Sequence, residues 1–337
     1  MIMPNRLLDF LSSFGLMAVG AALILFSTIS FSTASNFSNK FFPQSGPRRA
    51  SPSAGPSVLP ASRSLEPILT DNTPFTATLT AFSAMVVDDK TGKILFEKNS
   101  EAIRPLASIT KLAAAMVLLD LPINWSARAT TTEADIDSSD HHLKAGEIYR
   151  LSDLWKAALV GSSNSAVRIL VRSSGLTEEE FVLKMNDKVR SLKLASLSFV
   201  DPTGLDARDV GQAGDIIKLL KEAARFDKIR QTLSLSECDI QPLNAKKPRH
   251  IWSTDWLLTG WIPNGFERET MLGKTGFIND AGYNFVARLS DEKDNQIFVI
   301  ALGADSNESR FTEVRDLAKW TFGRYLWPGD EGYPAGE

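Results

Sequence analysis

A serine and a lysine stand three residues apart at the start of an apolar run. The segment Pro105-Leu-Ala-Ser108-Ile-Thr-Lys111 leads directly into Leu-Ala-Ala-Ala-Met-Val-Leu-Leu. Three residues is close to one helical turn, so Ser108 and Lys111 are expected on the same face of a helix. An amine in reach of a hydroxyl can activate the serine as a nucleophile without a histidine.

The sequence gives little support for a catalytic histidine or for a metal site. The chain has three histidines, and two of them, His141 and His142, are adjacent in a polar stretch that also holds three aspartates. Adjacent histidines in a polar loop lack a defined ligand spacing, so we expect neither a metal nor another cofactor. The single cysteine, Cys238, excludes an internal disulfide and is interpreted as a small packing side chain.

Two further motifs follow the Ser-x-x-Lys pair in chain order. Ser162-Ser163-Asn164 interrupts a helical pattern that runs from Leu151 to Ser174, and Lys274-Thr275-Gly276 lies late in an expected strand. Together the three motifs match the set found in penicillin-binding proteins and serine β-lactamases. A second Lys-Thr-Gly, at Lys90–Gly92, follows two aspartates and precedes the serine, so we interpret it as a hairpin turn.

On these motifs, residues 81–326 resemble the D-alanyl-D-alanine carboxypeptidase family, the low-molecular-mass penicillin-binding proteins of peptidase family S11. The similarity also includes the segments Val86-Val-Asp-Asp-Lys-Thr-Gly-Lys-Ile-Leu, Asp201-Pro-Thr-Gly-Leu and Ala-Gly-Tyr-Asn284. The resemblance implies a serine D,D-peptidase of peptidoglycan stem peptides, with β-lactam antibiotics as acylating inhibitors.

The resemblance implies a role for each residue that matches a motif. Ser108 would be the acylated nucleophile, and Lys111 the general base, kept neutral by burial and by the charge of Lys274. Ser162 would relay a proton to the leaving amine, and Asn164 would hold the substrate amide and Lys111. Ser163 and Ser165 are expected to have no part in the site.

The third motif would bind the leaving side of the substrate. Lys274 and Thr275 would bind a free carboxylate, and Gly276 would let the substrate backbone approach the strand. The family's oxyanion hole would correspond to the backbone N–H groups of Ser108 and Phe277.

The coarse secondary structure predicts an α/β (α+β) fold with an antiparallel sheet of about five strands. An early hairpin, 80–87 with 93–97, would join three late strands, flanked by N- and C-terminal helices, and a helical lobe would place the site in a cleft. The expected late elements are strands 270–277, 282–290 and 296–304 and a helix from Ser309 to about Leu326. The expected elements of the helical lobe are a capping-box helix from Thr177 to Leu192 and a helix from Gly211 to Phe226.

The N-terminal part differs in composition from the rest of the chain. Residues 1–34, with an uncharged apolar run at 11–31, predict a signal peptide or an uncleaved membrane anchor. Residues 35–74 read as a flexible Ser/Pro-rich linker, 75–327 as the catalytic domain and 328–337 as a tail. We therefore expect an exported, periplasmic enzyme, attached to the membrane if the N-terminal segment is retained, and the net charge of −3 gives no reason to expect nucleic acid.

Several functions remain open at this point. The scissile bond is either D-Ala-D-Ala or the D-Ala–diaminopimelate crosslink, and the short C-terminal tail and the stretch 135–145 slightly favour the crosslink. A serine β-lactamase is the first alternative, although no Glu-x-x-x-Asn pattern precedes Lys274. A non-catalytic cell-wall-binding or sensor domain is the second.

Overall fold

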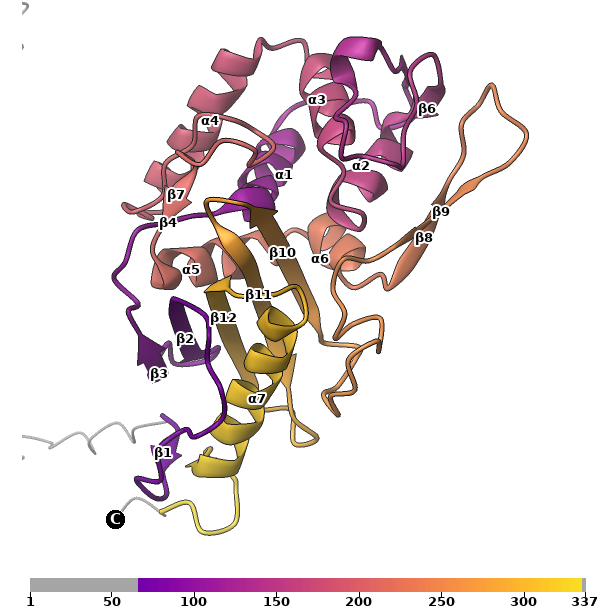
Figure 1. The fold of residues 1–337 in the computed structure, drawn as a ribbon. Coiled ribbons are helices and arrows are strands. Elements are labelled where there is room, and N and C mark those ends of the chain that lie inside the picture. Colours follow the sequence, from indigo (N-terminus) through magenta and orange to yellow (C-terminus); the bar gives the residue numbers. More distant parts are fainter. Residues whose placement is uncertain (1–65, 335–337) are drawn as a thin grey trace, which may run out of the picture. The chain divides into compact units, whose positions relative to one another are not determined.

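The computed structural model describes residues 66–334, which form a mixed α/β unit around one five-stranded antiparallel sheet (Figure 1). The strand order is β10-β11-β12-β2-β3. The strands are β2 (Ser83–Asp88), β3 (Ile94–Lys98), β10 (Leu272–Ile278), β11 (Gly282–Ser290) and β12 (Gln296–Ala304). The early hairpin therefore joins the three late strands, which confirms the predicted fold class.

The helices gather in two places, most of them in a lobe that follows the hairpin. They are a 3₁₀ turn η1 (Ala107–Thr110), α1 (Lys111–Asp120), η2 (Glu133–Asp135), α2 (Leu151–Leu159), α3 (Asn164–Ser173), α4 (Glu178–Ser191), α5 (Ala213–Ala223), α6 (Asp227–Leu233) and α7 (Ser309–Arg324). Within residues 66–334, four short two-stranded antiparallel sheets connect the segments between these helices. These are β1 (Ile68–Leu69) with β13 (Tyr325–Leu326), β4 (Arg104–Pro105) with β7 (Val210–Gly211), β5 (Arg128–Thr130) with β6 (Ile148–Arg150), and β8 (Glu237–Ile240) with β9 (Arg249–Trp252).

Both faces of the sheet are covered by helices, so its central strands are apolar on both sides. In β12, Ile297 and Val299 pack in the cluster that contains α7, whereas Phe298 and Ile300 pack in the cluster that contains α1 and α5. Successive side chains of a strand point to opposite faces, and this alternation places one set on each core. The long apolar run in the sequence thus reflects burial on two faces.

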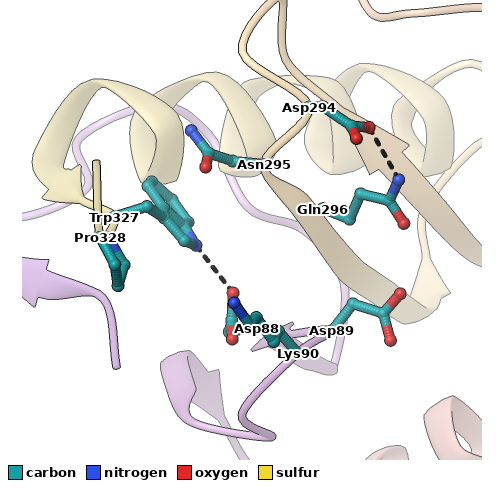
Figure 2. A pocket seen from close by; sticks show the side chains of 8 residues that line it. All are labelled: Asp88, Asp89, Lys90, Asp294, Asn295, Gln296, Trp327 and Pro328. Atoms are coloured by element: carbon teal, nitrogen blue, oxygen red, sulfur yellow. Dashed lines mark hydrogen bonds between the residues drawn. The ribbon is translucent and has the colours of Figure 1, made fainter. Parts of the chain in front are cut away.

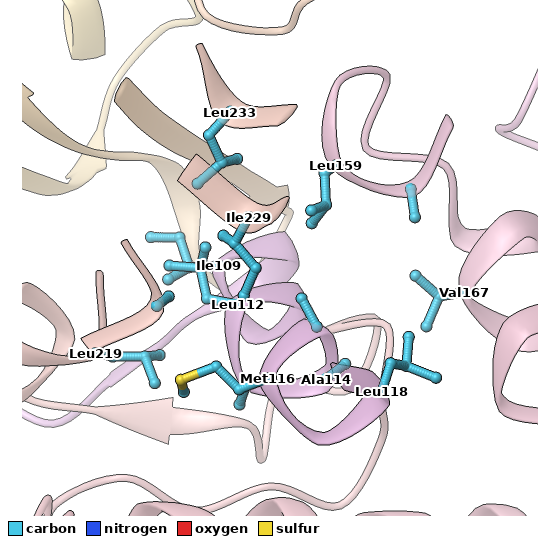
Figure 3. Packing of buried hydrophobic residues seen from close by; sticks show 14 of the residues in the cluster. Ile109, Leu112, Ala114, Met116, Leu118, Leu159, Val167, Leu219, Ile229 and Leu233 are labelled. Atoms are coloured by element: carbon cyan, nitrogen blue, oxygen red, sulfur yellow. The ribbon is translucent and has the colours of Figure 1, made fainter. Parts of the chain in front are cut away.

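Helix α1 forms the centre of the helical lobe, surrounded by side chains from α2, α3, α5 and α6 (Figure 3). Eight of its ten residues are buried, including Lys111. A helix that is apolar all round must be enclosed by other elements, and the three alanines at 113–115 let its neighbours approach closely. The helix that begins directly after Ser108 is therefore held rigidly.

Two helix boundaries agree with the sequence in detail. The predicted interruption is confirmed, because α2 ends at Leu159 and α3 begins at Asn164, with the Ser163 hydroxyl capping the Ala166 N–H at 3.0 Å. The capping box before α4 is also confirmed, with the Thr177 and Glu180 side chains each accepting the other's backbone N–H.

The limits of the folded part differ from the prediction. Strand β1 pairs with β13, and the Thr70 N–H donates to the Arg324 carbonyl oxygen at 2.8 Å, so the fold begins before Phe75. After β13, Lys293 bonds Asp330 at 2.8 Å, which attaches the start of the expected tail. The expected helix 211–226 is shorter, since α5 ends at Ala223 and a separate helix α6 follows.

The Lys90–Gly92 segment is the predicted turn. The Asp88 carboxylate accepts from the Thr91 N–H at 2.8 Å, and Gly92 has a φ of 76°, which glycine adopts without strain. A pocket lies beside this turn, where the Trp327 indole donates to Asp88 at 2.7 Å (Figure 2). This second Lys-Thr-Gly therefore closes the β2–β3 hairpin.

The expected signal or anchor at residues 11–31 and most of the linker lie outside the described residues. Within 66–334, no helix is long and apolar enough to cross a membrane.

Leu112 and Leu183 provide a matched test of the helical core. Leu112 in α1 is fully buried, whereas Leu183 in α4 is 61% exposed. We expect Leu112→Ala to lower the free energy of unfolding by about 3 kcal/mol through lost burial and a cavity. Leu183→Ala should change it by less than about 0.5 kcal/mol. Urea unfolding measures both, and equal effects would contradict the central position of α1.

Candidate active site

Ser108 sits in the 3₁₀ turn that joins β4 to α1. Asn284 of β11 donates to the carbonyl oxygens of Pro105 and Leu106 at 2.9 and 3.3 Å, which fixes the chain before the serine to the sheet. Ala107 has a φ of 50°, an unfavourable backbone conformation for a residue with a side chain. Strain of this kind persists only where the surroundings impose it, and here it sets the direction of Ser108.

The amine of Lys111 has three partners. Its Nζ lies 2.8 Å from Ser108 Oγ, 2.6 Å from Asn164 Oδ1 and 2.6 Å from the Thr203 carbonyl oxygen. The two latter oxygens only accept hydrogen bonds, so they take two N–H groups. In a neutral amine this leaves the lone pair directed at the hydroxyl of Ser108, the arrangement that a general base requires.

Burial favours the neutral form of Lys111. The side chain is 1% exposed, and loss of solvation lowers the pKa of its ammonium to about 7. Four aspartates, with Asp201 the strongest, oppose this shift because negative charge stabilises the protonated amine. Even so, a substantial fraction of Lys111 is neutral near pH 7.

Lys274 is the second buried lysine of the site. Burial lowers its pKa well below the ordinary value, and the charge of Lys111 lowers it further. Because repulsion between two ammonium groups is mutual, a proton on one disfavours a proton on the other. The charge of Lys111 thus acts on Lys274, whereas burial is the cause that lowers the pKa of Lys111 itself.

The junction between α2 and α3 places three serines in three different environments. Ser162 Oγ accepts from Lys274 Nζ at 2.8 Å, and Ser162 has a positive φ of 57°. Ser163 caps α3 and donates to Asp140, while Ser165 Oγ accepts the Asp137 N–H at 2.9 Å. Ser163 and Ser165, which were expected to have no part in the site, have a structural role, because they attach the polar loop to α3.

Strand β10 passes directly against the serine turn. A Cβ on Gly276 would lie 2.5 Å from the Leu106 carbonyl oxygen and 3.2 Å from the Ser108 nitrogen, so only glycine fits. The buried guanidinium of Arg310 donates to the Gly276 carbonyl oxygen at 3.1 Å. Thr275 lies 2.7 Å, oxygen to oxygen, from Thr254, and Phe277 stacks on the Tyr283 ring. Residues 108 and 274–277 are thereby brought together.

The loop 201–209 contributes to the site in a way that the sequence analysis missed. The Asp201 carboxylate accepts from the Thr203 and Leu205 N–H groups at 2.9 and 2.6 Å, a turn that directs the Thr203 carbonyl oxygen at Lys111. Gly204 has a φ of 84°, and a Cβ there would meet the Ala107 carbonyl oxygen at 2.0 Å. The Asp-Pro-Thr-Gly-Leu segment was the available signal, although a backbone carbonyl leaves no side-chain signature.

Asp255 is a further buried group close to Lys274. Its Oδ1 accepts the Leu257 and Leu258 N–H groups at 2.9 and 3.1 Å. Burial raises the pKa of this carboxyl to about 6, and the positive charges of Arg310 and Lys274 act in the opposite direction. No sequence motif indicated this residue.

The histidines and the cysteine lie outside this cluster of contacts. His250 Nδ1 is 3.0 Å from Asp239, and burial raises the pKa of the Cys238 thiol to about 11, which disfavours the nucleophilic thiolate. Within residues 66–334, no three His, Cys, Asp or Glu side chains come together as metal ligands.

Comparison with known proteins places these features in a family. The sequence model described as D-alanyl-D-alanine carboxypeptidase, peptidase S11, matches residues 70–306. A D-alanyl-D-alanine endopeptidase of Pseudomonas aeruginosa is 30% identical over 251 residues, which cover 73% of this chain and 79% of that protein. The D-alanyl-D-alanine carboxypeptidase DacF of Bacillus subtilis is 28% identical over 253 residues, covering 73% of this chain and 63% of that protein.

A solved structure supports the same assignment. Penicillin-binding protein D2 of Listeria monocytogenes, in its cefotaxime-bound form, superposes with a TM-score of 0.62 at 26% identity. The match covers 74% of this chain and all of that one.

Gly204 offers a test of the close approach between loop 201–209 and the serine turn. Gly204 and Gly175 both have positive φ, but a Cβ on Gly175 would meet nothing within 4 Å. We expect Gly175→Ala to cost about 1 kcal/mol of stability, the penalty of the backbone conformation alone. Gly204→Ala should cost more and displace Ala107 and Ser108.

Urea unfolding and the rate of labelling by a fluorescent penicillin read out the two consequences. Equal losses in both variants would contradict the predicted contact between Gly204 and Ala107.

Proposed function

This chain belongs to the D-alanyl-D-alanine carboxypeptidase family, peptidase S11, and we propose that within it the protein cleaves the D-Ala–diaminopimelate crosslinks of peptidoglycan. It is a serine-type D,D-peptidase, a hydrolase. The observation that carries the mechanism is the contact of buried Lys111 with Ser108 Oγ at 2.8 Å.

Acylation begins at Ser108. Its oxygen attacks the carbonyl carbon of the D-Ala in the scissile bond while its proton passes to neutral Lys111. The negative oxygen of the tetrahedral intermediate is held by the N–H groups of Ser108 and Phe277. The close passage of Gly276 against Ser108 supports this pairing, because it brings the two backbones together.

The leaving amine departs on the side of Ser162 and Lys274. The C–N bond breaks as the amine takes, through the Ser162 hydroxyl, the proton that Lys111 received from Ser108, and Lys111 becomes neutral again. The Ser162 hydroxyl contacts Lys274 at 2.8 Å. Lys274 and Thr275 bind the leaving-side carboxylate, whose negative charge favours the protonated form of Lys274. Asn164 orients the acyl-side amide together with Lys111. Water then attacks the ester and gives a proton to Lys111, which passes it to the Ser108 oxygen as the ester bond breaks.

A β-lactam enters the same sequence of steps. Ser108 opens the ring of the antibiotic and remains acylated, because the amine that leaves stays attached to the acyl group. The resemblance to a penicillin-binding protein with bound cefotaxime supports this part of the proposal.

Endopeptidase activity is favoured over carboxypeptidase activity by two observations. The D-alanyl-D-alanine endopeptidases of Pseudomonas aeruginosa and Haemophilus influenzae are 30% and 32% identical to this chain, whereas the carboxypeptidases DacF of Bacillus subtilis and DacC of Escherichia coli are 28% and 27% identical. The site is also flanked by the loop 135–145, attached to α3 through Ser163 and Ser165.

We place the enzyme outside the cytoplasm, where peptidoglycan lies. Residues 1–34 serve for export or as an inner-membrane anchor in this proposal. The Ser/Pro-rich segment after them tethers the catalytic domain.

Digestion of purified muropeptides tests the function directly. We expect the protein to convert crosslinked dimers into monomers and to be labelled by fluorescent penicillin, and Ser108→Ala to lose both properties. Loss of D-Ala from pentapeptide monomers with dimers left intact would exclude endopeptidase activity. Rapid, steady hydrolysis of nitrocefin would instead indicate a β-lactamase.

The adjacent residues Ser162 and Ser163 allow a role in proton transfer to be distinguished from a role in stability. Ser162→Ala should slow acylation by roughly 100-fold or more, in the range that a positioned proton-transfer group contributes. Ser163→Ala should lower stability by about 1 kcal/mol through the lost helix cap and leave acylation within a few-fold. Stopped-flow acylation and urea unfolding measure both variants, and similar acylation rates in the two would argue against Ser162 as the relay.

A further inference from the structure

An open pocket of about 600 Å³ lies between residues 141–144 and the tip of the β8–β9 hairpin. The hairpin extends outward beside β6 (Figure 1). No carboxylate lines the pocket. Its charged and titratable lining residues include His141, His142, Lys144, Lys246, Lys247 and Arg249. With His250, all three histidines of the chain are part of this lining.

Three lysines of the lining supply positive charge without an ion-pair partner among the described residues. Arg249 pairs with Glu147, and His250 lies within 3.0 Å of Asp239, so these two groups are engaged. Lys144, Lys246 and Lys247 are exposed and form no ion pair within residues 66–334. A concave surface lined by cations of one sign attracts an anionic ligand.

The pocket adjoins the active site on one defined side. A Cβ on Gly161 would lie 3.0 Å from His142 Nε2 and 2.7 Å from Ile251, so the lining packs directly against the residue before Ser162. Beyond β9, the Thr254 N–H donates to the Val160 carbonyl oxygen at 3.1 Å, and the Thr254 hydroxyl contacts Thr275 at 2.7 Å. The His142 side of the pocket therefore lies against the residue before Ser162, and the chain that leaves the pocket along β9 leads to Thr254, which contacts Thr275.

We propose that this basic pocket binds carboxylates of the stem peptide that leaves when a crosslink is cleaved. The inference rests on the proposed function and deepens it. A released D-Ala has a single carboxylate, which Lys274 and Thr275 already bind. A crosslinked leaving group is a whole stem peptide with further carboxylates, and only such a group continues past Thr275 into the pocket. The pocket thus selects crosslinked substrates over single stems.

A triple charge reversal tests the proposal. The variant carries Lys144→Glu, Lys246→Glu and Lys247→Glu, and the control carries Lys90→Glu, Lys184→Glu and Lys319→Glu, three exposed lysines outside the pocket. We expect kcat/KM for a purified crosslinked muropeptide dimer to fall roughly tenfold or more at low salt, because the variant loses several exposed ion pairs with the substrate. Release of D-Ala from a pentapeptide monomer should stay within about twofold. The control should leave both activities unchanged.

The outcomes separate this inference from the proposed function. If the pocket variant loses dimer and monomer activity equally, or keeps both, while wild type cleaves dimers, the inference is wrong and the proposed function stands. Absence of penicillin labelling at Ser108 in the wild type would defeat the proposed function itself. A second measurement uses the wild type alone at increasing salt concentration. Salt screens the attraction between the lysines and the substrate carboxylates, so it should lower kcat/KM for the dimer more than kcat/KM for the monomer. Equal salt dependence would also overturn the inference.

Discussion

The structure depends on one buried amine. Lys111 lies in the first turn of the most enclosed helix, and its Nζ touches a hydroxyl, a side-chain amide and a backbone carbonyl. Each partner comes from a different segment, so the helical lobe must be assembled before the amine is surrounded. Removing an ammonium from water is costly, and that cost favours the neutral form. The core around α1 therefore provides both the rigidity and the basicity of the site.

The same enclosure explains the strained backbone within the site. Ala107 and Ser162 have positive φ without being glycine, and both are adjacent to or part of the motifs that carry chemistry. Gly204 and Gly276 let two further segments touch the backbone around Ser108. Such conformations cost about 1–3 kcal/mol each and are tolerated where surrounding packing imposes them. Apolar cores on both faces of the sheet offset this strain.

Much of this arrangement could be predicted from the sequence, because its signals are local. One helical turn relates Ser108 to Lys111, and β-branched and aromatic runs bounded by turn residues located the five strands. The Thr203 carbonyl oxygen could not be predicted, since every residue has one and only the tertiary fold selects it. The β8–β9 hairpin was missed because its strands are short and carry charged residues such as Glu237 and Arg249 in place of a regular apolar pattern. Strand β1 was missed because its two residues gain their partner from the far end of the chain.

The central claim is that burial makes Lys111 a base, and a titration of that amine tests it most directly. NMR of protein carrying labelled lysine, with the signal assigned by its loss in Lys111→Arg, would follow the Nζ group between pH 5 and 11. We predict a pKa near 7 in place of the ordinary 10.5. At a pH below that value the amine is protonated and cannot accept the Ser108 proton. The rate of acylation by penicillin should therefore rise with pH, with its midpoint at the same pKa. A Lys111 that stays protonated to about pH 10 while Ser108 is acylated at full rate near pH 8 would contradict the account.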